Sequence, residues 1–418
     1  MSQRYWRDED FPPSPVQRTG GYQSKNQAVE GCRISFCRNG RSHTGTSLCT
    51  FPPTAETGGG ARFEPADILL ARITPCLENG KIAQYDPAGK PAFGSTEFIV
   101  LRAKPGVADP GFIHCLALSK EIRKPAILSM AGASGRQRAD AKVVAEALVP
   151  APALVIQRRI AEVLGAYDDL IEVNRRRIVV LEEMARALFE EWFIRLRFPG
   201  YESVPIEDTP DGPLPADWSW GTAGDLLLFD PRTRIPREGE KPFIPMGHVD
   251  TATSLIAEPE VRTGNSGSKF QNGDTLFARI TPCLENGKTG LVRHLPGPDG
   301  IGFGSTEFIV MRAARAGLAF SYCLSRLPAF REHARQSMSG ASGRQRARKE
   351  SVAQFVIAIP PTNDLFERFE KAASPMLELA GEIGLSNERL ASARDLLLPR
   401  LISGPLLITP TDRELEVD

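Results

Sequence analysis

Arginines on two glycine-rich segments are the residues of this sequence best placed to bind an anion. Residues 132–138 read Gly-Ala-Ser-Gly-Arg-Gln-Arg, and residues 340–346 repeat them letter for letter. Glycine at this density disfavours a helix interior, so each segment is predicted to be an exposed loop. A guanidinium on such a loop can reach a phosphate or the O6 and N7 edge of guanine; a merely solvated loop is the alternative. The predicted contacts here are Arg136, Arg138, Arg344, Arg346, Arg348 and Lys349.

A second duplicated segment carries cations, a cysteine and carboxylates. Residues 71–81 read Ala-Arg-Ile-Thr-Pro-Cys-Leu-Glu-Asn-Gly-Lys and return unchanged as residues 278–288. Its cations form a second set of predicted contacts, with packing at a turn and a strand end as the alternative: Arg72, Lys81, Arg279 and Lys288. Cys76 and Cys283 are interpreted as buried small residues, because no histidine stands near either to complete a ligand set. Glu78 with Glu97, and Glu285 with Glu307, could form carboxylate pairs, but turn capping and ion pairing are the favoured interpretation of these residues.

The sequence lacks the motifs that catalysis would need. It contains no GxxxxGK[ST] phosphate loop, no glycine-rich dinucleotide fingerprint and no histidine-rich metal cluster. We therefore expect no catalytic residue, no metal ligand and no cofactor in this chain, so that any catalysis belongs to partners.

Composition is that of a water-soluble protein. The 418 residues are 41% hydrophobic and 24% charged, with a formal net charge of zero. Zero net charge argues against binding nucleic acid by bulk charge but allows local basic loops. The seven cysteines include no CxxC pair, which favours reduced thiols. Neither a signal peptide nor a run of roughly 18 apolar residues is found, so we expect a cytoplasmic protein without a membrane span.

These motifs belong to a domain-sized repeat. Residues 93–100, Phe-Gly-Ser-Thr-Glu-Phe-Ile-Val, also return as residues 303–310. The period far exceeds that of solenoid repeats, which indicates two similar globular domains. In each copy we expect short strands, one helix and a last strand. The expected elements are strands 67–73, 97–102 and 143–149 with helix 111–130, then strands 274–280, 307–312 and 352–359 with helix 320–338.

Residues 1–60 do not resemble their expected counterpart in the second copy. They hold Phe-Pro-Pro-Ser-Pro at residues 11–15, a Gly-Gly-Gly run and three of the cysteines. Three interpretations stay open: divergence of a specificity-bearing region, a disordered arm, or a slip of reading frame that ends near residue 57.

Two long helices are predicted to join the domains. Residues 157–192 show apolar positions spaced alternately by three and four, the seam of a coiled coil that needs a partner helix. The seam residues are Ile160, Leu164, Tyr167, Ile171, Asn174, Ile178, Leu181, Ala185 and Leu188. The same spacing returns in the partner as Phe369, Ala373, Met376, Ala380, Ile383, Asn387, Leu390, Arg394 and Leu397. Pro375 and Gly381 should weaken the second helix, and a buried Asn174 and Asn387 should fix the register.

The predicted fold class is α+β, with two similar mixed α/β domains separated by two long antiparallel coiled-coil helices in a pseudo-two-fold internal repeat. A helix of ~36 residues spans ~54 Å, so the pair is a rigid spacer. Such an object suits a target with two half-sites. The expected boundaries are 1–152 for the first domain, 153–198 for the central helix, 199–216 for a linker, 217–360 for the second domain, 361–404 for the last helix and 405–418 for a tail.

The duplicated motifs, the proline break before Gln-Arg-Arg-Ile-Ala at residues 157–161 and the ending Arg-Asp-Leu-Leu-Leu-Pro-Arg-Leu-Ile-Ser-Gly at 394–404 resemble the specificity subunit of type I restriction-modification enzymes. The resemblance implies two target-recognition domains that bind an asymmetric bipartite site on double-stranded DNA. It implies helices that set the gap and dock two modification (methyltransferase) subunits, joined by restriction (motor-nuclease) subunits. S-adenosylmethionine, ATP and Mg would then bind in those partners.

Two other functions remain as alternatives: a stand-alone nucleic-acid-binding regulator, and an enzyme that uses a Glu and an Arg of each copied turn. Base-reading residues are expected where the halves differ, such as residues 232–241 or 262–270.

Overall fold

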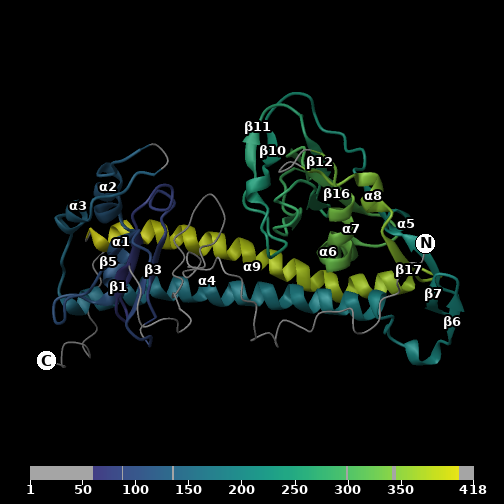
Figure 1. The fold of residues 1–418 in the computed structure, drawn as a ribbon, viewed down its shortest axis with the longest axis horizontal. Coiled ribbons are helices and arrows are strands. Elements are labelled where there is room, and N and C mark those ends of the chain that lie inside the picture. The colour runs from purple at the N-terminus through teal and green to yellow at the C-terminus, as the bar shows by residue number, and fades with distance from the viewer. Residues whose placement is uncertain (1–59, 87, 134–135, 298–299, 341–344, 404–418) are drawn as a thin grey trace.

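Two long helices run along the whole molecule and carry a lobe near each end (Figure 1). The computed structural model describes residues 60–403 except 87, 134–135, 298–299 and 341–344. The helices are α4 (Leu154–Phe189) and α9 (Asp364–Ile402). We call residues 60–147 the first lobe and residues 217–359 the second lobe. The predicted class, two mixed α/β domains on a pair of long helices, is confirmed.

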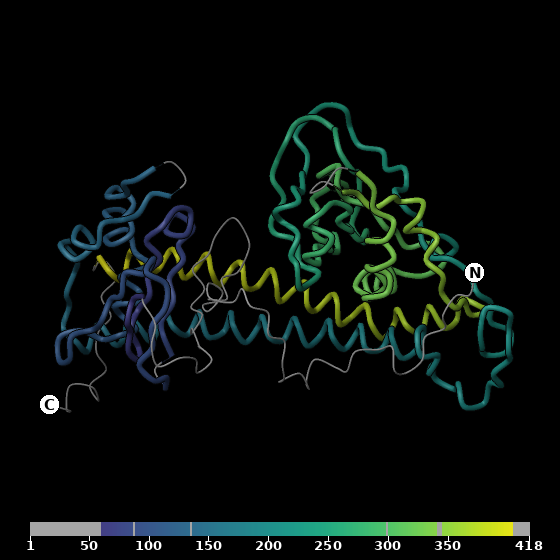
Figure 2. Tube along the Cα trace, in the orientation of Figure 1, coloured from purple at the N-terminus to yellow at the C-terminus, as the bar shows by residue number. Residues whose placement is uncertain are grey.

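The two helices are antiparallel. Near the start of α4, Ile160 shares a core cluster with Ile402 at the end of α9. Midway, Ile178 packs with Ile383. At the far end the rings of Phe189 and Phe369 lie 6.1 Å apart. Partner numbers fall along α9 as they rise along α4, and Figure 2 shows the two traces side by side over this length.

The seam differs in detail from the predicted heptad positions. Tyr167, Leu181 and Leu188 are only half buried, and in each case the next residue is the buried one: Asp168, Glu182 and Phe189. On α9, Met376, Asn387, Leu390 and Leu397 are half buried, whereas Leu377 and Ala391 are buried. A helix of about 3.6 residues per turn drifts away from a strict heptad. The contact line therefore moves across α4 instead of following one heptad stripe.

Polar groups tie the helices together at their centre. Asn174 Nδ2 donates to Asn387 Oδ1 over 2.9 Å, and Asn387 Nδ2 donates to the Ile171 carbonyl over 3.4 Å. A slip of one turn would bury these amides against apolar side chains without partners. The guanidinium of Arg394 pairs with Asp168, and their side chains are only 3% and 7% exposed. Both contacts require the observed register.

The second lobe holds two four-stranded sheets and a short pair of strands. One sheet has the order β14 (Thr289–Leu291), β13 (Thr275–Ala278), β16 (Phe308–Ala313) and β9 (Leu227–Phe229), all antiparallel. The other has the order β11 (Glu260–Arg262), β10 (Lys241–Ile244), β15 (Ile301–Gly304) and β12 (Ser268–Gln271), in which β10 and β15 are parallel. Strand β17 (Val356–Ile359) pairs with β8 (Ser219–Thr222).

Short helices link the second lobe to the long pair. They are α5 (Ala223–Leu226), α6 (Leu318–Arg326), α7 (Pro328–Gln336) and α8 (Lys349–Ala353). Buried rings of α6, such as Phe320, pack in one core with Phe189 and Phe369 of the long helices. The predicted helix 320–338 is thus two helices, broken at Leu327 before Pro328. The expected linker contains a hairpin of β6 (Ile206–Thr209) and β7 (Gly212–Pro215), after a π-helical end of α4 at Glu190–Ile194.

The first lobe repeats part of this plan. Its described strands are β1 (Ala61–Phe63), β2 (Ile68–Ala71), β3 (Ile82–Gln84), β4 (Ala92–Gly94) and β5 (Phe98–Leu101), and its helices are α1 (Pro110–Leu118), α2 (Lys120–Leu128) and α3 (Ala141–Ala145). Strands β3, β2 and β5 form one antiparallel sheet, and β1 pairs with β4. By the repeat, the counterparts of β8 to β11 would precede residue 60, outside the described residues, and the alternatives for residues 1–60 stay open.

The prediction of a strand at residues 143–149 is wrong. Helix α3 occupies its start, and Leu148 is 95% exposed. In the second lobe the corresponding β17 is held by the ladder of β8. A strand needs such a neighbour, and the counterpart of β8 in the first copy falls before the described residues. The predicted helix 111–130 is likewise divided, into α1 and α2 at Ser119.

Two glycines of α9 allow the second lobe to pack closely against this helix. Helix α9 runs unbroken from Asp364 to Ile402, with Pro375 inside it. A Cβ added at Gly381 would lie 3.0 Å from Arg293 Cδ, and one at Gly384 would lie 2.7 Å from Leu255 Cδ2. Gly381, predicted only to weaken the helix, thus allows the lobe to approach closely.

A buried carboxylate on α4 holds the same lobe. Tyr322 of α6 donates its hydroxyl to Glu182 Oε2 over 2.5 Å, and the Ser254 backbone N–H donates to Glu182 Oε1 over 2.7 Å. Glu182 is 1% exposed. The second lobe is therefore fixed by polar bonds to α4 as well as by packing on α9. Within the described residues, no helix is long and apolar enough to cross a membrane.

We predict that Asn174→Ala destabilises the chain by about 1–3 kcal/mol, because Asn387 loses a buried hydrogen-bond partner. Replacing both asparagines by leucine should restore stability, since no amide is then left unpaired. Urea unfolding checks this, with the exposed Ser386→Ala on α9 as control. A double variant as unstable as the summed single changes would contradict the proposed pairing.

A second prediction concerns acid. His114 of α1 is buried beside Arg394, and burial, with the Arg394 charge adding to it, lowers the pKa of His114 to about 4. The unfolded chain takes up this proton near pH 6.5, so stability is complete above that pH and falls as the pH drops towards 4, by about 3 kcal/mol. Urea unfolding between those values should show a flatter profile for His114→Gln. An unchanged pH profile in that variant would assign the loss to other groups.

Candidate nucleic-acid interface

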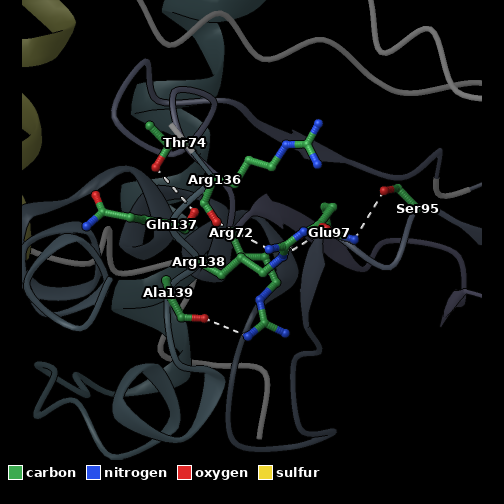
Figure 3. Close-up of polar contacts among 8 residues, drawn as sticks. All are labelled: Arg72, Thr74, Ser95, Glu97, Arg136, Gln137, Arg138 and Ala139. Carbon is green, nitrogen blue, oxygen red and sulfur yellow. Dashed lines mark hydrogen bonds and ion pairs between the residues drawn. The ribbon is translucent and has the colours of Figure 1, made fainter. Parts of the chain in front are cut away.

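The arginine that ends the first glycine-rich loop is bound within its own lobe. The backbone of Arg138 pairs with Ile73 and Ala131, which fastens the loop to the turn after β2. Its guanidinium meets Glu97, with Nη2 2.7 Å from Oε1 and Nε 3.0 Å from both oxygens (Figure 3). The hydrogen bonds and charge of Glu97 raise the pKa of Arg138. Arg138 therefore acts as a clamp on the loop.

The second lobe repeats this clamp. The backbone of Arg346 pairs with Ile280 and Ser339, and its Nη2 lies 2.7 Å from Glu307 Oε1. Hydrogen bonds from Glu307 likewise raise the pKa of Arg346. In both copied loops the last arginine thus forms an ion pair with a glutamate at the start of a sheet strand, which agrees with the interpretation of the glutamates as turn caps or ion-pair partners. DNA contact by Arg138 and Arg346 stays a prediction, since each arginine side chain is about half exposed and its ion pair can open.

The other predicted cations of the two loops differ in their exposure and in their interactions. Arg136 is exposed, and in Figure 3 no dashed line joins its guanidinium to Glu97. Arg344 lies outside the described residues. Arg348 Nε donates to Ser339 Oγ over 3.3 Å, and Lys349 Nζ lies 3.9 Å from Asp230 Oδ2. Arg136 is thus the best placed of these to reach a phosphate in the first lobe.

The second set of predicted DNA contacts lies at the turns, where the cations pack against neighbouring segments. Arg72 Nη2 donates to the Ala139 carbonyl over 2.8 Å, and Lys288 Nζ donates to the Met246 carbonyl over 2.6 Å. Arg279 and Lys81 are half buried. These positions favour the structural alternative, in which the cations hold neighbouring segments.

Four of the cysteines lie in the part of the chain that the structure describes, and all four are free thiols. Cys76 and Cys283 are half buried, where the sequence predicted full burial, and Cys115 and Cys323 are buried free thiols. Over the described part of the chain, no group of three or more His, Cys, Asp or Glu side chains is arranged to hold a metal ion.

The second lobe has a basic groove. The sequence predicted base-reading residues in this region only as two broad ranges, 232–241 and 262–270. It has a volume of about 730 Å³ and is lined by residues from the β9–β10 connection and from the start of β12. Its cations are Arg232, Arg234, Arg237 and Lys269. Three of them fall in the predicted range 232–241 and one in 262–270, but nothing in the sequence ranked them above Arg262, which pairs with Glu260 at 2.6 Å.

Comparison with known proteins shows that the chain is similar to members of one family. The family model for the type I restriction modification DNA specificity domain matches residues 16–183. The EcoEI specificity subunit of Escherichia coli is 28% identical over 165 residues, which cover 38% of this chain and 27% of that protein. The HindI specificity subunit of Haemophilus influenzae is 28% identical over 407 residues, covering 82% and 87%.

The EcoAI specificity subunit of Escherichia coli is 30% identical over 158 residues, covering 36% of this chain and 26% of that protein. The chain thus spans about a quarter of the length of the two Escherichia coli relatives. Among solved structures, the type I restriction-modification S subunit from M. genitalium matches with 14% identity and a TM-score of 0.47, covering 83% of this chain and 84% of that one.

The ion pair between Arg138 and Glu97 leads to a prediction about how DNA affinity depends on salt. We expect Arg136→Ala to lower the slope of log affinity for duplex DNA against log salt by about one, as a lost phosphate contact does. Arg138→Ala should leave that slope nearly unchanged, because Glu97 already neutralises the guanidinium. Glu97→Gln is the matched control, since it frees Arg138 and should steepen the slope. Equal losses in both arginine variants would show that the Glu97 pair opens on DNA.

Proposed function

The chain belongs to the family of type I restriction-modification specificity proteins, and we propose from this that it binds an asymmetric, bipartite site on double-stranded DNA and directs partner subunits to it. The observation that carries the proposal is the pair of repeated lobes fixed at opposite ends of an antiparallel helix pair. Each lobe would contact one half-site. The same division is proposed for the whole chain, with recognition domains at residues 1–152 and 217–360 and helices at 153–198 and 361–404.

The length of the spacer supports two contacts on one duplex. Helix α4 has 36 residues, which corresponds to about 54 Å at ~1.5 Å per residue. Half-sites on one face of DNA are separated by about one turn, ~34 Å, or a multiple of it. Since the lobes differ outside the copied motifs, the half-sites need not have the same sequence.

An exposed apolar stripe on α4 supports the docking of partner helices. Leu170, Val173, Val180 and Met184 are between 45% and 52% exposed. They follow helical spacing on a face of α4 other than the one packed on α9. We propose that two modification subunits dock on the helix pair, that restriction subunits join them, and that these partners bind S-adenosylmethionine, ATP and Mg. This chain would itself be non-catalytic and would act in the cytoplasm, where the DNA is.

A matched deletion tests the spacer. Residues 169–175 of α4 face residues 386–392 of α9, and removing both blocks keeps the Asp168–Arg394 and Ile178–Ile383 contacts in register. Seven residues shorten the pair by about 10.5 Å, or about three base steps of ~3.4 Å. We predict that the preferred gap between half-sites shrinks by about three base pairs while each half-site keeps its sequence. Mapping methylated sites in DNA exposed to the variant complex measures the gap.

The control replaces Asn174 and Asn387 by leucine, which changes the same seam layer without changing length, and its gap should equal that of the wild type. An unchanged gap in the deletion variant would reject the spacer role. Specific DNA binding without any association with a methyltransferase subunit would instead favour a stand-alone regulator.

A further inference from the structure

The basic groove of the second lobe is built on a rigid base. At one end of the β9–β10 connection, Asp230 exchanges two hydrogen bonds with Val310 of β16, over 2.7 and 2.8 Å. Thr233 Oγ1 accepts from Arg312 Nη2 over 2.8 Å, and Arg312 is paired with the buried Asp274 at 2.7 Å. At the other end Lys241 Nζ donates to the Glu238 and Gly239 carbonyls. The segment between these anchors is thereby fixed in place.

Two arginines stand side by side on this segment. Exposure alternates along it: Pro231, Thr233 and Ile235 are half buried, whereas Arg232 and Arg234 are exposed. Alternation by two is the mark of extended chain, in which residues i and i+2 share a face. Both guanidinium groups are therefore presented on the open side.

The charges of the groove are uncompensated. Its lining has four cations, Arg232, Arg234, Arg237 and Lys269, and the one acid Asp230. Within the described chain, these four side chains make neither a hydrogen bond nor an ion pair. Other exposed arginines of the lobe are occupied, as Arg346 is by Glu307 and Arg335 by Glu332. Four cations beside a single acid favour a polyanion as the ligand.

We propose that Arg232 and Arg234 read G·C base pairs of the second half-site in the DNA major groove, while Arg237 and Lys269 hold flanking phosphates. This rests on the proposed function. A guanidinium bonds guanine O6 and N7 with two parallel hydrogen bonds, the commonest specific contact to a base edge. Residues two apart on extended chain are separated by about 6.6 Å, close to two base steps of ~3.4 Å. The two arginines thus match bases two positions apart.

The assignment concerns one half-site only. By the repeat, the counterpart of this segment in the first copy precedes residue 60, outside the described residues, and the two sequences differ there. Changes at Arg232 and Arg234 should therefore relax one block of the site and leave the other block intact.

The test uses the full chain in complex with its methyltransferase subunit, and duplex DNA with a randomised central region as the probe. Bound duplexes are sequenced after selection. For Arg232→Lys with Arg234→Lys, we expect the preference for guanine at one or two positions of one block to fall about tenfold or more, with the salt slope unchanged. Lysine keeps the charge but loses the two-pronged geometry. Arg232→Ala with Arg234→Ala should relax the same positions and also lower the slope.

Arg335→Ala, on an exposed arginine that Glu332 occupies, is the matched control and should leave both blocks unchanged. Thermal melting establishes that each variant is folded. A consensus that stays unchanged in both double variants, or affinity that falls equally for all sequences, would overturn the assignment. A wild-type complex that selects no bipartite sequence would instead overturn the proposed function, and this assignment with it.

Discussion

The register of α4 against α9 is the constraint on which the rest of the structure depends. Each lobe comes directly before one of the two helices in the chain, so a shift of one helix along the other would shift one lobe relative to the other. Apolar packing alone tolerates such a shift, because one aliphatic layer resembles the next. The Asn174–Asn387 bond and the buried Asp168–Arg394 pair do not tolerate it, since a displaced amide or charge would be buried without a partner. Polar groups therefore set the register of the two helices and with it the distance between the lobes, while apolar packing stabilises the helix pair.

The chemistry of the copied motifs suggests anion binding, but in the structure their arginines stabilise the fold. Arg138 and Arg346 form ion pairs with Glu97 and Glu307, so the identical loops stabilise the identical frames. The uncompensated arginines of the second lobe lie where the two halves differ. Common residues thus build the scaffold, and divergent residues are the ones that we propose distinguish DNA sequences.

Sequence reasoning reached the architecture because the repeat and the spacing of apolar residues are properties of the chain itself. It also placed Asn174 and Asn387 on facing helices. It placed Tyr167 in the seam, where the structure buries Asp168 instead, because the drift of a straight helix from the heptad depends on the partner. It could not find the Arg138 clamp, since Glu97 comes opposite only after β5 pairs with β2. The strand expected at residues 143–149 failed for a similar reason, because a strand depends on a neighbour elsewhere in the chain.

The two lobes are not attached in the same way. Aligning Cys115 with Cys323 places His114 of the first lobe where Tyr322 stands in the second. Tyr322 reaches across to Glu182 on α4, while its lobe also binds α9 through Glu370, whose carboxylate accepts from the Ala319 and Phe320 backbone N–H groups. The second lobe therefore bridges both helices by hydrogen bonds. Under mechanical load or rising temperature, these bonds should hold together the helix ends beneath the second lobe.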